Sequence, residues 1–562
     1  MSAPVSLGIF DKYKGGLQYP AWEITSKDTM RKPDRIAEFV SAKVIEHGPA
    51  RCTVQVVQKS DDSVFTNNIS LSAGSDMVEV QCEFYWNSQR TLCKNLFSFS
   101  CANKEATFDL GLGAIKRGNA NEKLYEVPAQ KWADITDRSG EYGVSVISDC
   151  KYGWDKFNDN TLRLTVIHTP LNNFRPKSMQ SMMDLGLNRY GYAICAHSGT
   201  DMTRVQTASR EFNAPLTAFV ADKHSGVLGS TYSFANISDS GVIIRAIKKA
   251  ENGNEIVVRV NEGNNEYHSN VRLTLGNGII SAREIYASEE HICDAAVNDG
   301  YLVFNMKPYE VKSFALTLVP AKNKADYIQQ SPVVLPCNTN AFSSNISPTD
   351  SGIYSKKYTI PSELVPDTIT SGGVNFNVSK DNQNCLLADG QTVKLKPGYN
   401  KLILLCASLD GDREFTLNFD NTPVKIKVSD IEERPFAWDM YSLKRTAKIK
   451  TDVVGFECTH THSAKGDNFA HQLFFFKYEI DTNGAETLTL PRDKNFIILA
   501  ATQVNTPCEC KCATALYDAV KPRQFDFKLK GIKAKLNYAF RKFISYCMEA
   551  DNVTRIVYLY YR

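Results

Sequence analysis

The sequence predicts a mainly β protein, with several antiparallel β-sandwich domains in tandem and a short C-terminal helix. Before residue 520, apolar and polar residues alternate in short runs that clusters of Gly, Asn, Ser and Pro separate. This period-two pattern is typical of half-buried strands, and many short strands without helices between them favour sandwiches. The chain has 562 residues, which is too long for a single core, so we expect several domains.

Composition excludes some classes of partner. The net charge is only +3, which gives no reason to expect nucleic acid or an anionic membrane. No apolar run approaches the roughly 20 residues of a membrane span, and the first residues lack the pattern of a signal peptide. The 15 cysteines are scattered through apolar runs, as free thiols in a reducing compartment would be. The prediction is a cytoplasmic protein.

The first part of the chain divides into a lead-in and a long β block. Residues 1–30 are interpreted as an irregular lead-in that Phe10, Tyr19 and Trp22 anchor. Residues 31–321 are interpreted as β-sandwich domains. The first expected strands alternate clearly; they are 37–46, 52–58, 63–71, 77–86 and 92–98.

The second part begins with a polar segment. Residues 322–351 are rich in Asn, Ser and Pro and are predicted to be a linker. Alternating runs return in 352–520, which predicts a further β-sandwich module. Residues 521–562 are predicted to be a basic amphipathic helical tail. Its apolar residues recur at three- and four-residue spacing; they are Leu529, Ile532, Leu536, Phe540, Phe543 and Cys547.

Segment 122–170 is the most informative stretch about function. It holds Tyr125-Glu-Val-Pro128, then Lys131-Trp-Ala-Asp134, then a run from Gly143 to Asp155 and a strand that ends before Pro170. Its order resembles the post-catalytic β region of glycoside hydrolase family 38, the α-mannosidase family, in its bacterial-type form.

Later segments extend this resemblance. Asp184-Leu-Gly186, followed by Tyr190 and His197, resembles a strand of the same family, although the family usually has a histidine where this chain has 187–189. The resemblance covers roughly residues 8–515 and is strongest at 122–316.

The resemblance implies a role in the hydrolysis of α-linked mannose. In that family, a zinc ion and an aspartate nucleophile lie in an N-terminal catalytic domain, and the signals of that domain are not found in this chain. We therefore expect the chain alone to be inactive, with no catalytic residue or cofactor of its own and unknown substrate-binding residues. The implied partners are α-mannosides and the zinc-containing catalytic domain. An apolar surface left bare without that domain would favour homo-oligomers.

Two other functions stay open from the sequence. The chain could be a stand-alone carbohydrate-binding protein without catalysis, which a row of exposed aromatic residues in a shallow groove would favour. It could instead be a structural or interaction protein, which a groove lined by aliphatic residues would favour.

Thr459-His460-Thr461-His462 is the most metal-like pattern in the chain. On a strand, both imidazoles point to one face, and His471 is a candidate third ligand. The alternatives are contact with a sugar and an exposed polar loop.

Other candidate residues have simpler interpretations. Cys508, Cys510 and Cys512 are more closely spaced than the usual metal thiolates, so a cysteine-rich edge is the main interpretation and metal or redox chemistry the alternative. His197 is interpreted as a satisfied core or interface histidine. The tryptophans are interpreted as packing residues, with sugar stacking as the alternative; they are Trp22, Trp86, Trp132, Trp154 and Trp438.

Overall fold

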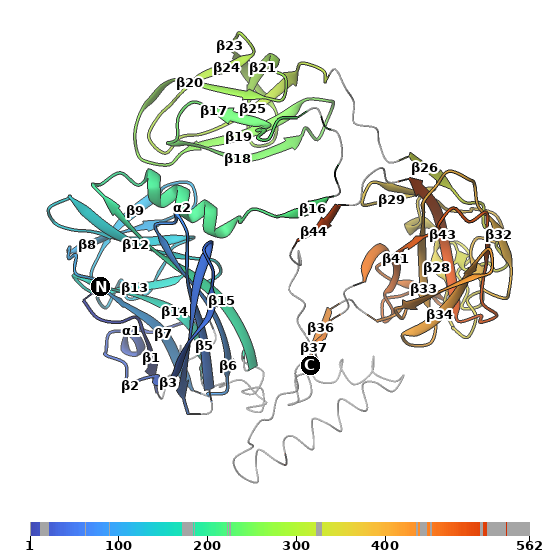
Figure 1. Cartoon of the computed structure of the whole chain (residues 1–562), viewed down its shortest axis with the longest axis horizontal. Coiled ribbons are helices and arrows are strands. Elements are labelled where there is room, and N and C mark those ends of the chain that lie inside the picture. The colour runs from blue at the N-terminus through green and yellow to red at the C-terminus, as the bar shows by residue number, and fades with distance from the viewer. Residues whose placement is uncertain are drawn as a thin grey trace. The chain divides into compact units, whose positions relative to one another are not determined.

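The structure is a computed structural model in which the chain forms two compact units (Figure 1). The first unit holds Met1–Leu216 and Gly226–Lys322, and the second holds Thr217–Ser225 and Asn323–Asp526. Each unit is described by itself. The structure describes 2–505 except 12–21, 62, 89, 171–183, 185, 222, 224–225, 227, 322–328, 434–435, 439–446 and 450–451, and it also describes 510–513 and 536.

The first unit begins with a sandwich of two sheets. The six-stranded sheet contains, in spatial order, β10 (Val127–Pro128), β13 (Gly153–Asn158), β14 (Thr161–Thr169), β7 (Thr91–Ser98), β1 (Ser6–Phe10) and β2 (Arg35–Ile36). The nine-stranded sheet contains β3 (Glu38–His47), β4 (Arg51–Ser60), β5 (Ser63–Ser72), β6 (Met77–Trp86), β15 (Gly186–Ser198), β12 (Tyr142–Ser148), β11 (Trp132–Thr136), β8 (Glu105–Asp109) and β9 (Ala114–Gly118).

The core of this sandwich lies between the two sheets. Phe97 and Trp154 of the six-stranded sheet belong to the same buried cluster as Phe84 and Phe108 of the nine-stranded sheet. The alternation seen in the sequence becomes a burial pattern, because every second residue of a strand faces the core. The expected mainly β fold is thereby confirmed, and strands β3 to β7 follow the predicted ranges closely.

The lead-in prediction for residues 1–30 differs from the structure. Strand β1 pairs along its whole length with β7, and Leu7, Ile9 and Phe10 are buried. A short strand that is buried on both faces has no alternation, so its sequence does not stand out from a loop. The short helix α1 (Ser26–Thr29) follows.

A second, smaller sandwich completes the first unit. Its four-stranded sheet contains β17 (Ala235–Ile237), β20 (His268–Leu275), β24 (Tyr301–Met306) and β23 (Val297–Asn298). Its five-stranded sheet contains β18 (Val242–Lys249), β19 (Ile256–Glu262), β25 (Val311–Leu318), β21 (Ile279–Ile285) and β22 (His291–Ala295). Leu273 and Phe304 pack against Val258 and Phe314 across the core between the sheets.

Helix α2 (Thr203–Asn213) follows the first sandwich in the chain. Val205 and Ala208 share a buried cluster with Trp132, Ile147 and other residues on the outer face of the nine-stranded sheet. The helix thus covers the middle of that sheet on the side away from the sandwich core.

The second unit is built around a sheet that is buried on both faces. Its strands are β26 (Gln329–Pro332), β43 (Phe496–Asn505), β33 (Lys401–Ser408), β41 (Leu473–Asp481) and β38 (Val453–Cys458), with β31 (Leu386–Leu387) also paired to β43. A four-stranded sheet covers one face; it contains β32 (Thr392–Lys394), β42 (Thr487–Thr489), β34 (Arg413–Phe419) and β35 (Thr422–Val428).

Short elements complete this unit. They are β27 (Phe342–Ser343) with β28 (Ile360–Pro361), the 3-10 turn η2 (Ser362–Leu364), β29 (Thr368–Ser371) with β30 (Val374–Asn377), β36 (Phe436–Trp438) with β37 (Ala447–Ile449), β39 (Thr461–Ser463) with β40 (Gly466–Asn468), and β16 (Phe219–Ala221) with β44 (Cys510–Cys512).

The linker prediction for 322–351 also differs from the structure. Strand β26 pairs with β43, and Ala341 and Phe342 lie in the core of the second unit. Residues 329–351 are therefore part of the folded unit. Prolines and asparagines hid this, because the two strands here are only four and two residues long.

The predicted tail helix, 521–562, lies outside the described residues except for Leu536. The eleven cysteines whose side chains the structure describes are all free thiols. Within the described part of the chain, no helix is both long and apolar enough to cross a membrane.

Candidate functional site

One end of the nine-stranded sheet exposes the face that elsewhere forms the sandwich core. The pairing places Val44 of β3 opposite Val54 of β4, Val54 opposite Ile69 of β5, and Ile69 opposite Val80 of β6. Residues directly opposite each other in an antiparallel pair point to the same face of the sheet. The row therefore runs along one face, from the edge of the sheet into its core.

Exposure rises steadily along this row. The exposed fraction is 3% for Val80, 38% for Val54 and 61% for Val44. No described element of the first unit covers the outer two strands on this side. Five apolar side chains make up what we call the open face: Phe39, Ala42, Val44, Val54 and Val56.

The reverse side of the same strands carries a polar row, although Val57 of β4 also lies on that side. Lys43, Gln55, Asn68 and Gln81 form the neighbouring cross-strand row, and the Gln55 amide donates a hydrogen bond of 3.1 Å to Asn68. This side has the composition of a solvated surface, so the open face differs from it chemically as well as in position.

Strand β3 is the edge of the sheet and carries two irregularities in its pairing. One lies between Phe39 and Ser41 and the other between Val44 and Glu46. Bulges at a sheet edge bend the strand and discourage uncontrolled edge-to-edge pairing. Side-chain contact through the open face is therefore a better use of this end of the sheet than addition of another strand.

Buried polar groups are the other candidates for chemistry in the first unit. Asp134 is fully buried and accepts hydrogen bonds from Thr136 at 2.7 Å, from Ser145 at 2.7 Å and from His197 Nε2 at 2.8 Å. A catalytic triad would need the serine to donate to the histidine. Here Ser145 and His197 both bond to the carboxylate, so the group holds three strands together and does not activate a nucleophile.

This contact also shifts the pKa of His197. Burial opposes the charged imidazole, but the hydrogen bond and negative charge of Asp134 outweigh burial, so the pKa of His197 is raised above 6.5. Gly143 lies against the ring, and a Cβ there would come within 2.4 Å of His197 Nε2. His197 is buried as expected, but only its Nε2 is satisfied, by Asp134, because the buried Nδ1 has no hydrogen-bond partner among the described residues.

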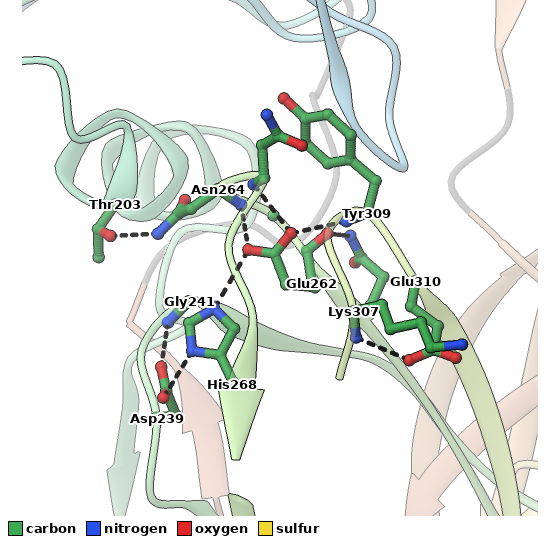
Figure 2. Close-up of polar contacts among 12 residues, drawn as sticks. Thr203, Asp239, Gly241, Glu262, Asn264, His268, Lys307, Tyr309 and Glu310 are labelled. Carbon is green, nitrogen blue, oxygen red and sulfur yellow. Dashed lines mark hydrogen bonds and ion pairs between the residues drawn. The ribbon is translucent and has the colours of Figure 1, made fainter. Parts of the chain in front are cut away.

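Glu262 lies at the end of β19 and is fully buried (Figure 2). Its carboxylate accepts backbone N–H bonds from Asn264 at 2.6 Å and Asn265 at 2.9 Å. A third N–H bond comes from Tyr309 at 2.8 Å. The side chain of Asn264 also donates to Thr203 at the start of α2. These bonds join α2 to a loop of the second sandwich.

His268 extends the same network (Figure 2). Its Nδ1 lies 2.7 Å from Asp239, and its Nε2 lies 3.3 Å from Glu262. Burial opposes the charged ring, but the hydrogen bonds and charges of the two carboxylates raise the pKa of His268 above 6.5. With one imidazole and three backbone donors around it, Glu262 is committed to holding the loop and is not placed for acid–base catalysis.

A third buried group lies on the six-stranded sheet. Lys94 Nζ lies 2.6 Å from Asp155, and Arg163 Nε lies 2.6 Å from the other oxygen of the same carboxylate. Lys94 also pairs with Glu126, so the charges balance. Arg163 donates further to the backbone carbonyls of Thr29 and Arg31. The cluster therefore fastens the segment around α1 onto the sheet.

The candidate histidines from the sequence lie in the second unit. His460 and His462 come together as expected, and the carboxylate beside them is Asp467. His471 lies elsewhere: its Nδ1 is 3.1 Å from Glu432, and its ring lies against Tyr358. Asp467 was missed by sequence reasoning, because the hairpin turn falls at Ala464 and Lys465, and neither is a typical turn residue.

The remaining candidates from the sequence are the tryptophans and the cysteine-rich segment. Trp86, Trp132 and Trp154 are among the largest fully buried side chains, whereas Trp22 is exposed. Cys510 and Cys512 lie on β44; their side chains, Cys508 and the side chain of Trp438 lie outside what the structure describes.

A shallow cleft of about 370 Å³ opens on the second unit. Asn338, Asp389 and Lys494 supply its polar lining, and Tyr354 is the aromatic residue of the lining that the structure describes. A row of exposed aromatic residues, which would favour direct sugar binding, is not present in that described lining.

Three segments of the chain match the models of known protein families. Residues 2–175 match the family model described as glycosyl hydrolases family 38 C-terminal domain, and 241–314 match the family 38 C-terminal beta sandwich domain. Residues 329–507 match the AziU2-like beta-sandwich domain.

A curated relative is alpha-mannosidase G of Dictyostelium discoideum. It is 26% identical over 261 residues, which are 44% of this chain and 23% of that protein. The chain thus spans about a quarter of the length of this relative.

Two solved structures also resemble the chain. An alpha-mannosidase from Enterococcus faecalis has 12% identity and a TM-score of 0.45, and the match covers 56% of this chain and 38% of that one. A family 36 alpha-galactosidase from Geobacillus stearothermophilus has 9% identity and a TM-score of 0.23, with 38% and 33% covered.

Proposed function

Because residues 2–175 and 241–314 are C-terminal β-domains of glycoside hydrolase family 38, we propose that this chain supplies the non-catalytic β portion of an α-mannosidase. The reaction would be hydrolysis of α-linked mannose in mannosides and oligosaccharides. The nucleophile, the acid–base group and the zinc ion would come from a separate catalytic domain. The match to alpha-mannosidase G, at 23% of its length, supports this division of labour.

The open face is the observation that carries this proposal. Its residues continue the apolar rows of the sandwich core, yet no described element of the first unit covers them. Burying one valine side chain is worth roughly 1.5–3 kcal/mol, so such a face gains from a partner. We assign the catalytic domain as its occupant, because most of the relative lies outside the region that matches this chain.

The buried carboxylates of the first unit support a non-catalytic role. Retaining glycoside hydrolysis uses two carboxyl groups about 5 Å apart that both reach the substrate. The buried carboxylates are all engaged by neighbouring donors or cations; they are Asp109, Asp134, Asp155 and Glu262. Their bonds hold strands and loops, which supports a chain that leaves substrate chemistry to a separate domain.

The other two functions are kept as alternatives with less support. A stand-alone carbohydrate-binding protein would need aromatic platforms, and the open face is mainly aliphatic, with Phe39 as its aromatic member. A purely structural or interaction protein would use the same face with a different partner. Both alternatives predict that this chain does not form an active α-mannosidase when it is mixed with a catalytic domain.

Self-association of the purified chain tests the open face. Without its partner, the wild-type chain should associate through this surface as concentration rises. Val44→Lys combined with Val54→Glu removes the apolar pair and replaces it with an ion pair across the same two strands. Association would bury both valines, so their loss should weaken association by at least about tenfold, measured by sedimentation velocity.

Gln55→Glu is the matched control, because Gln55 lies opposite Lys43 on the reverse side of the same strands. It should associate like the wild-type chain. A wild-type chain that stays monomeric at all concentrations, or a double variant that associates as strongly, would remove the open face as a docking surface.

A further inference from the structure

A β-hairpin in the second unit gathers three metal-ligand side chains on one face. Strands β39 and β40 pair with His462 directly opposite Asp467. His460 lies two residues before His462, so in extended chain both imidazoles point the same way. The ligand atoms of His460, His462 and Asp467 all lie within 4.8 Å of one another.

The spacing of these atoms fits a tetrahedral metal site. Asp467 Oδ1 lies 3.3 Å from His462 Nε2 and 3.7 Å from His460 Nε2. Ligands about 2.0 Å from a tetrahedral zinc ion are roughly 3.3 Å from each other. The side chains therefore need little movement to close around an ion.

A chain of hydroxyl groups fixes the tautomer of neutral His462. The Thr359 hydroxyl donates to the carbonyl of Thr349 at 2.7 Å, so it accepts from Ser343 Oγ at 2.6 Å. Ser343 then accepts from His462 Nδ1 at 2.8 Å. The proton of the neutral ring is thus on Nδ1, and the lone pair is on Nε2, which faces Asp467.

The ring is held in this orientation from several sides. The backbones of His462 and Thr359 exchange two hydrogen bonds, of 2.9 Å and 3.0 Å. His460 is oriented similarly, with its Nδ1 3.1 Å from the Thr459 hydroxyl and its ring against Phe469. Hydrogen bonds to the nitrogen that does not bind the ion are the usual support of histidine ligands.

With Nε2 unprotonated, several lone pairs meet with no proton between them. Asp467 Oδ1 and Asn345 Oδ1 both approach His462 Nε2, the latter at 2.8 Å. Such an arrangement is repulsive unless the ring takes a second proton, the Asn345 amide turns, or a cation enters. A cation satisfies all three acceptors at once.

We propose that His460, His462 and Asp467 form a binding site for a divalent transition-metal ion, with zinc as the probe ion. Imidazole and carboxylate ligands suit zinc and its neighbours in the first transition row. Asn345 or water would complete the coordination. Asp467 is 46% exposed in its side chain, so an ion can enter from solvent. This site is independent of the proposed α-mannosidase role and distinct from the zinc of a catalytic domain.

Zinc titration of the full-length, untagged chain tests the site. The background protein carries Cys508→Ser, Cys510→Ser and Cys512→Ser, so that the cysteine-rich segment cannot bind zinc. Isothermal titration calorimetry should show one zinc ion per chain. His460→Ala and Asp467→Asn should each remove that binding event, and zinc should raise the melting temperature of the background protein but not of either variant.

Two further variants sharpen the assignment. His471→Ala is the matched histidine control and should bind zinc like the background protein. Ser343→Ala keeps all three ligands but loses the bond to Nδ1, so affinity should fall by about 10- to 100-fold. Circular dichroism in the presence of EDTA verifies that each variant folds. Absence of zinc binding by the background protein, or an unchanged titration with His460→Ala and Asp467→Asn, would overturn the proposal.

Discussion

Two phenylalanines in one cross-strand row have opposite environments. Phe84 of β6 lies opposite Phe65, Phe65 lies opposite Gln58, and Gln58 lies opposite Phe39 of β3. Phe84 is 1% exposed and stacks on Phe65 with ring centroids 5.3 Å apart. Phe39, on the same face of the same sheet, is 67% exposed.

The difference lies in what covers each end of the sheet. The six-stranded sheet packs over Phe84, whereas no described part of the first unit packs over β3 and β4. The strand sequence alternates equally well at both ends. A strand pattern therefore specifies that a face needs cover, and the covering element can belong to another domain.

The largest expected loss of stability comes from a substitution at the covered end of the nine-stranded sheet. Phe84→Ala should reduce the free energy of unfolding by about 3–5 kcal/mol, because it opens a cavity among buried aromatic rings. Phe39→Ala should change it by no more than about 0.5 kcal/mol in the isolated chain. Urea unfolding followed by the fluorescence of the buried tryptophans measures both. Equal losses for the two variants would mean that the open end is covered after all.

Buried and exposed carboxylates should differ in the same way as buried and exposed phenylalanines. Asp155→Ala leaves Lys94 and Arg163 buried without their shared carboxylate, and should cost about 3 kcal/mol of unfolding free energy. Glu38→Ala removes a carboxylate at the exposed edge and should cost less than about 1 kcal/mol. A loss for Asp155→Ala as small as for Glu38→Ala would show that the segment around α1 does not hold the cluster away from water.

The smallest expected effect is a pH dependence of stability at the buried pair of Asp134 and His197. Asp134 raises the folded pKa of His197 above its unfolded value of 6.5, so the folded state holds the proton more tightly. The resulting stability is fully present below about pH 6.5 and is lost as pH rises through the folded pKa.

His197→Gln should therefore narrow the difference in unfolding free energy between about pH 6 and about pH 8. His47→Gln, at the exposed end of β3, is the matched control and should follow the wild-type chain. Identical pH profiles for His197→Gln and the wild-type chain would contradict a raised pKa of His197 in the folded state.

Much of the fold was predictable from alternation alone. The ranges of β3 to β6 followed directly from period-two patterns and turn residues. Strand β1 could not be found in this way, because a strand buried on both faces loses its alternation. The strands of 329–343 were hidden for a different reason: a few residues supply too little pattern to outweigh prolines and asparagines.

The candidate sites were predictable only in part. His460 and His462 stood out because two residues of spacing puts both rings on one strand face. The position of Asp467 depends on a hairpin register that the sequence does not state. His471 does not join the site, because its ring bonds to Glu432. The alternation of β3 and β4 predicted an apolar face on these strands. It could not predict that this face is uncovered, because cover depends on the whole sandwich and not on any one strand.

The most direct test of the central claim is hydrolysis of a chromogenic α-mannoside by the purified chain with added zinc. We expect no turnover, whether or not zinc binds at His460, because the carboxylates of Asp134, Asp155 and Glu262 are committed to structural bonds. Zinc-dependent hydrolysis by the chain alone, abolished by His460→Ala, would contradict the account and place an active site among the β-domains.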